Sequence, residues 1–190
     1  MKPDIGITGC LAAILLMVAG AAQGASIEGV YSLKLGQSRG EAETTLAQGE
    51  HFRRIAGRFT DGFPLYETTL GEHELRVHPT FEEDTLVEIA LRFREHASPN
   101  DVAPIIRPQV RFAVTALSGR FGEPNRVPVP VDRIEPGTFE DGGRVVTHQW
   151  RHGKRLAEVV LWRDRFTLGA AIVLAEQHTR DTGSSASEAF

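Results

Sequence analysis

Histidine and acidic side chains are the groups in this sequence that could hold a metal ion or move a proton. The chain has seven histidines among 190 residues. On a strand, His148 and His152 would share one side but lie about 13 Å apart at ~3.3 Å per residue, too far to share a zinc ion. His73, His78 and Glu67 form a set that would suit a small exported hydrolase or metal-dependent enzyme. This alternative predicts a cleft joining at least two clustered His and Glu side chains, with perturbed pKa values.

Nucleophilic catalysis, phosphate binding and nucleic-acid binding have little support. The sequence contains no Gly-x-Ser-x-Gly nucleophile elbow, and its glycine-rich residues 36–40 lack the lysine that would contact a phosphate. With 21 Lys and Arg against 25 Asp and Glu, a net charge of −4 offers no basic excess for nucleic acid. A single cysteine excludes a disulfide framework and a zinc ribbon. We therefore expect no catalytic residues, no metal and no cofactor.

Trp162 is the most informative residue for binding. Strand alternation over residues 155–162 places this large aromatic side chain on the face expected to be less buried. Tryptophan and arginine are enriched among the residues that dominate binding interfaces. The predicted binding surface consists of Gln149, Arg151, Leu156, Glu158, Val160 and Trp162. In the alternative interpretation, residues 125–143 fold over this face, or the two sheets pack edge to edge, and Trp162 is part of the core.

Two helices are expected to support these side chains. Ser38 and Glu41 fit a capping box that starts a short helix ending near Gly49. A second helix precedes a stop signal at Gly122 and Pro124. Its apolar residues follow helical spacing at Ile106, Val110, Ala113, Leu117 and Phe121.

Strand signals follow each helix in a set of three. The first set covers residues 63–70, 72–81 and 85–93, and the second covers 144–151, 155–162 and 167–176. Gly71 and Gly153, each expected in a two-residue hairpin turn, are 82 residues apart, as are Thr85 and Thr167. These signals predict an α+β fold of two tandem repeats, each with one helix packed on a three- to four-stranded antiparallel meander. The expected division is 26–97 and 98–178 for the repeats and 179–190 for a disordered tail.

The first 25 residues have the features of an export signal. Lys2 precedes an apolar stretch over residues 10–22, and small residues lead to an expected cleavage site after Ala25. The apolar stretch is short and rich in Ala and Gly, whereas a membrane span needs ~20 apolar residues. We therefore expect a periplasmic or secreted protein with no stable membrane anchor.

Short motifs resemble two families of exported proteins. Residues 35–41, Leu-Gly-Gln-Ser-Arg-Gly-Glu, together with Leu46 and the following meander, resemble the opening of the BamE/SmpA small envelope lipoproteins. Residues 121–124, Phe-Gly-Glu-Pro, resemble the helix stop of that family. The tandem layout is similar to the β-lactamase inhibitory protein family. The first helix lacks that stop, and neither a lipidation cysteine nor paired cysteines are present.

The resemblance implies non-enzymatic modules that use a sheet face or loops to grip another protein. Our leading hypothesis is accordingly an exported binding module that contacts another cell-envelope or secreted protein. Besides the enzyme considered above, a third hypothesis is the binding of a small apolar ligand between helix and sheet. That hypothesis predicts a cavity that the core side chains do not fill.

Overall fold

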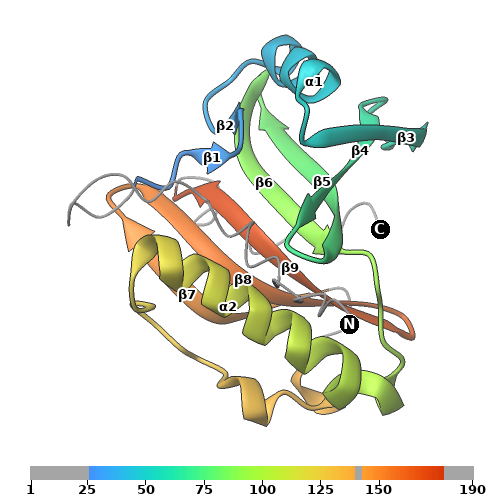
Figure 1. Ribbon diagram of the computed structural model, residues 1–190, viewed down its shortest axis with the longest axis vertical. Helices are drawn as coiled ribbons and strands as arrows, with labels where there is room; N and C mark the ends of the chain where they lie inside the picture. Colours follow the sequence, from blue (N-terminus) through green and yellow to red (C-terminus); the bar gives the residue numbers. More distant parts are fainter. Residues whose placement is uncertain (1–25, 140–142, 178–190) are drawn as a thin grey trace, which may run out of the picture.

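A computed structural model describes residues 26–139 and 143–177. The expected export signal and the predicted tail lie outside the described residues. Within these residues, two α-helices and nine strands make up most of the regular structure (Figure 1). The helices are α1 (Arg39–Gln48) and α2 (Arg107–Phe121), and a π-helix (Val102–Ile106) leads into α2. Short 3₁₀ turns cover Pro99–Asp101, Val131–Arg133 and Pro136–Thr138.

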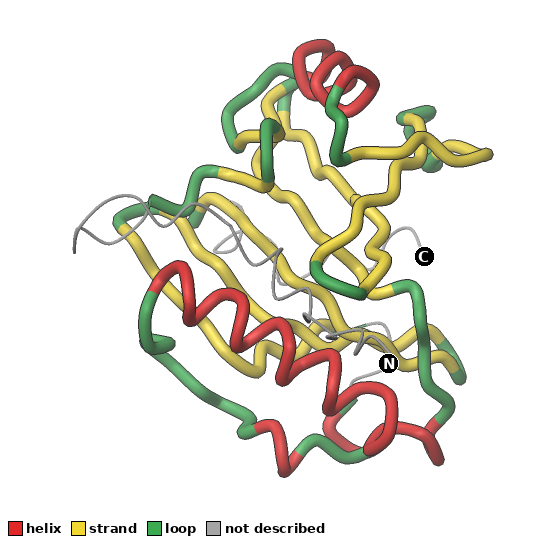
Figure 2. Tube along the Cα trace, viewed as in Figure 1, coloured by secondary structure: helices red, strands yellow, loops and turns green. Residues whose placement is uncertain are grey.

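Seven strands form one antiparallel sheet in the order β3-β4-β5-β6-β9-β8-β7. They are β3 (Phe52–Arg58), β4 (Pro64–Leu70), β5 (His73–Glu82), β6 (Thr85–Phe93), β7 (Arg144–His152), β8 (Arg155–Asp164) and β9 (Thr167–Glu176). A separate two-stranded ribbon contains β1 (Gly29–Val30) and β2 (Leu33–Lys34). Figure 2 shows that strands predominate over helices.

The predicted α+β fold of two tandem helix-plus-meander repeats is wrong. Strands β6 and β9 pair directly, with Leu91 opposite Ile172, so the two sets of strands form one sheet. Helix α2 packs on β8 and β9, while its Phe112 also lies 4.3 Å from His73 of β5. One helix therefore covers strands from both sets. Strand patterns identify the hairpins correctly, but alternation within a hairpin contains no information on which outer strands join.

The two hairpin turns behind the tandem interpretation are present, but their surroundings differ. Gly71 and Gly153 have φ values of 59° and 60° between two-residue hairpin partners. A Cβ on Gly71 would lie 3.1 Å from the Phe112 ring, whereas a Cβ on Gly153 would have open space around it. The turns are locally alike because both need left-handed backbone, which glycine adopts without a steric penalty.

Both helices pack on one face of the sheet, called here the helix face. The Ser38 hydroxyl accepts from the Glu41 backbone N–H (3.3 Å), and the Glu41 carboxylate accepts from the Ser38 N–H (2.8 Å), which confirms the capping box. Helix α1 buries Ala42 and Leu46 completely. Helix α2 buries its predicted stripe of Val110, Ala113 and Leu117 and ends at Gly122 with φ 80°. In Figure 1, α2 runs across β8 and α1 lies near the opposite end of the sheet.

The other side of the sheet, called here the opposite face, holds a second and smaller apolar cluster. Its buried members are Ala90, Val160, Trp162, Ala171, Val173 and Ala175. Strands β8 and β9 are thus buried on both faces, which explains their nearly continuous apolar sequence. Neither described helix has the length and hydropathy required to span a bilayer.

Candidate binding face

The six residues predicted to form a binding surface do lie together on the opposite face. Arg151 is paired with Leu156 and Gln149 with Glu158, so strand alternation gives the correct face. Most of this set is nevertheless buried: the exposed fractions are 2% for Leu156, 0% for Glu158, 2% for Val160 and 7% for Trp162. Only Arg151 is exposed, while Gln149 is half-buried and donates from its amide to Glu158. The structure thus shows Trp162 in a core rather than in an open aromatic patch.

The Trp162 ring is enclosed by three neighbours. It lies against Gly169, where a Cβ would be 2.3 Å from two ring atoms. The His96 ring approaches at 5.0 Å in a perpendicular arrangement, and the Arg92 guanidinium carbon is 5.3 Å from the ring centroid. Glycine at position 169 is therefore a packing requirement of the tryptophan.

Arginine side chains dominate the opposite face beside this apolar cluster. We call Arg76, Arg92, Arg94 and Arg144 the arginine cluster. Arg76 on β5 and Arg92 on β6 stand directly opposite each other. Two like charges in such cross-strand positions destabilise a sheet. The charges of this pair therefore oppose folding, and packing of Arg92 on the Trp162 ring accounts for only one of its two members.

Burial and neighbouring positive charges lower the pKa values of two side chains at the arginine cluster, Arg92 and His78. Desolvation, followed by the neighbouring Arg144 and Arg76 charges, lowers the pKa of Arg92. Desolvation, Arg92 and Arg76 together lower the pKa of His78 to about 3. His78 is consequently neutral at pH 7, and positive charge at this place comes from arginine alone.

The acidic side chains nearby are bound to the outer arginines. Glu67 is 4% exposed, accepts from Arg53 Nη2 (2.8 Å) and forms an ion pair with Arg94 Nε at 3.2 Å. Arg94 Nη1 also contacts Glu74 (2.8 Å). Arg144 Nη1 lies 2.9 Å from both carboxylate oxygens of Glu88.

Arg76 is the exception within this arrangement. It lies opposite Glu67 in the register, but the Glu67 oxygens contact Arg53 and Arg94 instead. Within the described part of the chain, Arg76 makes no ion pair, and its buried Nε has no hydrogen-bond acceptor. Leaving a buried donor without an acceptor costs about 1–3 kcal/mol.

The sheet separates His73 from the other two residues of the enzyme hypothesis, His78 and Glu67. His73 lies on the helix face against Phe112, while His78 lies on the opposite face with Phe59 at 4.8 Å. Glu67 is held by two arginines. Residues 26–139 and 143–177 contain no group of three or more His, Cys, Asp or Glu side chains placed to hold a metal ion.

Sequence reasoning missed the arginine cluster. Alternation shows that Arg76 and His78 share one side of β5, and that Arg92 of β6 and Arg94 just after this strand share one side. That alternation was a usable signal of a basic face. The register that places Arg76 opposite Arg92, and the approach of Arg144 from β7, depend on the assembled sheet.

Comparisons with protein-family models, with curated proteins and with solved structures find no match to this chain.

Proposed function

We propose that this protein is a non-enzymatic binding module that holds an acidic surface of another protein on its arginine cluster. If the first 25 residues act as an export signal, the partner is a cell-envelope or secreted protein. The observation that carries the proposal is Arg76, a half-buried arginine that makes no ion pair within the described residues and stands opposite a second arginine. A carboxylate from a partner placed beside Arg76 would reduce the repulsion between the two guanidinium groups.

The net charge of the whole chain favours a local binding site over nonspecific electrostatic binding of acidic partners. The net charge is −4, so an acidic partner is repelled by the protein as a whole. Binding of an acidic probe must then come from a local concentration of positive charge. Arginine suits this role because its planar guanidinium can donate two parallel hydrogen bonds to a carboxylate.

Poly-L-glutamate is the probe for testing this proposal. We expect calorimetric titration at low salt to show binding to the wild-type protein, and added salt to weaken it as the charges are screened. Arg76→Glu should lower the affinity by at least about tenfold, equivalent to 1.4 kcal/mol. Arg76→Gln removes the charge with less repulsion and should give a smaller loss.

Arg120→Glu is the matched control, because Arg120 is an exposed arginine near the end of α2. This variant should keep the wild-type affinity, and circular dichroism should confirm that all the variants fold. Absence of binding by the folded wild-type protein would contradict the proposal. Equal losses in Arg76→Glu and Arg120→Glu would also contradict it, since they would show that only net charge matters.

A further inference from the structure

The two edge strands of the seven-stranded sheet differ in their backbone hydrogen-bond partners. At one edge, the backbone of Arg126 bonds in both directions with Gln149 of β7, and the Asn125 side chain accepts from the Arg151 N–H. At the other edge, β3 pairs with β4 only, and no other described segment pairs with it. Unpaired N–H and C=O groups on an edge strand can accept a further strand.

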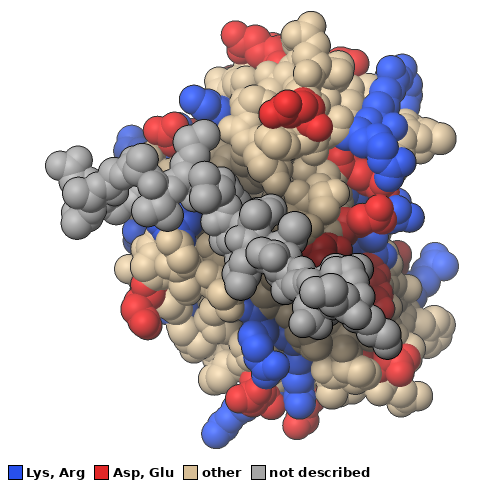
Figure 3. Space-filling view, viewed as in Figure 1, with Lys and Arg blue, Asp and Glu red and all other residues tan. Residues whose placement is uncertain are grey.

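The β3 edge is exposed and basic. Apart from Phe52 and the half-buried Ile55, the residues of β3 are exposed, including Arg53, Arg54 and Arg58. Figure 3 shows Lys and Arg atoms gathered on the side of the molecule where Figure 1 places β3. The side chain of Arg54 makes no hydrogen bond or ion pair within residues 26–139 and 143–177.

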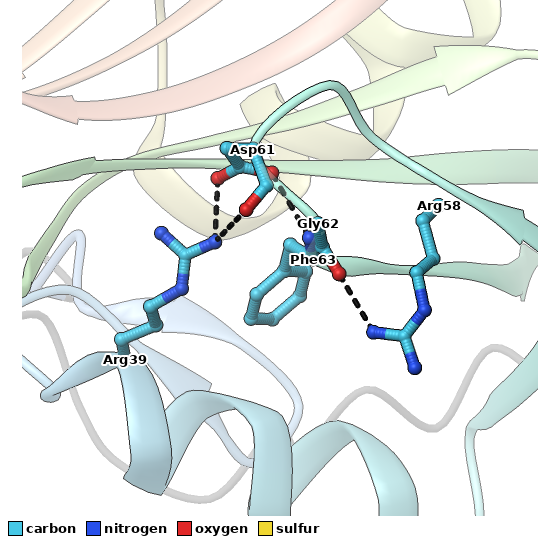
Figure 4. Close-up of polar contacts among 5 residues, drawn as sticks. All are labelled: Arg39, Arg58, Asp61, Gly62 and Phe63. Carbon is cyan, nitrogen blue, oxygen red and sulfur yellow. Dashed lines mark hydrogen bonds and ion pairs between the residues drawn. The ribbon is translucent and has the colours of Figure 1, made fainter.

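Polar contacts fix the loop that follows β3. Arg39, at the start of α1, donates to the Asp61 carboxylate (2.7 Å) and to the Asp61 carbonyl oxygen (3.2 Å) (Figure 4). The other Asp61 carboxylate oxygen accepts from the Phe63 N–H (3.0 Å). Arg58 donates to the Gly62 carbonyl oxygen (2.7 Å). The far end of β3 is thus held in place, which reduces the ordering cost of a strand that binds there.

We propose that β3 accepts an extended acidic segment of a partner protein as an eighth strand of the sheet. Backbone hydrogen bonds would supply the affinity, as in other cases of strand addition, and acidic side chains opposite Arg54 and Arg58 would supply selectivity. A second copy of this chain fits poorly, because two β3 edges would bring their arginines together. This site involves residues outside the arginine cluster, so it can fail or succeed independently of the proposed function.

The test uses a fluorescent peptide of alternating glutamate and threonine, long enough to pair with the seven residues of β3. Fluorescence anisotropy should show binding to the wild-type protein. A peptide of the same sequence with alternate backbone nitrogens methylated should bind at least about tenfold more weakly, because it lacks the N–H groups for pairing. Replacing glutamate by lysine in the peptide should abolish binding.

Protein variants locate the site. Arg54→Glu should weaken peptide binding about tenfold, whereas Arg120→Glu and Arg76→Glu should leave it unchanged. Hydrogen exchange of the β3 backbone amides should slow when the peptide is bound. The inference is overturned if the methylated peptide binds as well as the unmodified one, or if Arg54→Glu has no effect. Binding of poly-L-glutamate that depends on Arg76, with no binding of the alternating peptide, would reject the β3 site and leave the proposed function intact.

Discussion

The C-terminal strands β8 and β9 and the N-terminal strands β5 and β6 differ on the opposite face of the sheet, which is mainly apolar in the first pair and charged in the second. In β8 and β9, apolar residues occupy both faces apart from the buried Glu158, and eight consecutive residues of β9 are buried. In β5 and β6, the helix face is apolar, whereas the opposite face contains Arg76, His78 and Arg92. The C-terminal strands bury both faces, and their buried carboxylate, Glu158, accepts a hydrogen bond from Gln149. The N-terminal strands carry the like-charged pair of Arg76 and Arg92, and we propose that binding takes place there for that reason.

The largest effect is expected from shortening Trp162. Trp162→Ala should lower the free energy of unfolding by about 3–5 kcal/mol, as expected for a buried aromatic residue. Urea denaturation followed by circular dichroism measures this loss. Arg94→Ala, which lies on the same face in the other half, should cost less than ~1 kcal/mol because its ion pairs are partly exposed. Similar losses of unfolding free energy in the two variants would contradict the difference proposed between the C-terminal and N-terminal strands.

The second largest effect concerns acid stability. Burial and two arginines lower the pKa of His78 to about 3, whereas an unfolded histidine titrates near 6.5. Its contribution to stability is therefore complete above pH 6.5 and is lost progressively as the pH falls toward 3. At pH 5 the loss amounts to about 2 kcal/mol. Unfolding free energies of His78→Gln, measured between pH 7.5 and 5, should fall less steeply than those of the wild-type protein.

His152→Gln is the control for this measurement, because His152 is an exposed histidine of β7. It should keep the pH dependence of the wild-type protein. An unchanged slope in His78→Gln would show that the charged half does not keep this histidine neutral.

A smaller effect is expected at the start of α1. Ser38→Ala removes the hydroxyl that caps the helix and should lower the free energy of unfolding by about 1 kcal/mol.

Trp150 and Trp162 both lie in the C-terminal half, so tryptophan fluorescence follows that half while circular dichroism follows both. If the sheet unfolds as one unit, both signals should shift by the same amount. Thr44→Ala within α1 is the control and should cost nothing, because alanine is the better helix former.

The smallest effect has the opposite sign. Arg76→Thr removes one member of the like-charged pair and should raise the free energy of unfolding by roughly 0.2–1 kcal/mol. Chemical denaturation at low salt, where charge repulsion is least screened, measures this gain. A clear loss of stability would mean that Arg76 serves the fold.

Local signals in the sequence predict the elements well. The capping box at Ser38, the apolar stripe of α2 and the turns at Gly71 and Gly153 depend on residues a few positions apart, and all are present. The order of the strands in the sheet, in contrast, depends on pairing between residues far apart in the sequence. The small residues Ala171, Val173 and Ala175 on the opposite face of β9 were the available sign that this strand lies inside a larger sheet.

The candidate binding face likewise combines features that nearby residues predict with features that depend on the assembled sheet. Alternation places Trp162 and Glu158 on the correct face, but their burial depends on the assembled sheet and on the approach of Arg92 and His96. The unpaired state of Arg76 depends on Glu67 contacting two other arginines. A pairwise view of the hairpin predicts a simple Glu67–Arg76 pair. Competition among several arginines for one carboxylate appears only in three dimensions.

Measuring the affinity of Arg76→Thr for poly-L-glutamate together with its free energy of unfolding shows whether Arg76 serves binding or folding. We expect the affinity to fall about tenfold while stability stays equal to or above that of the wild-type protein. Unchanged affinity, or a parallel fall in affinity and stability, would contradict this expectation.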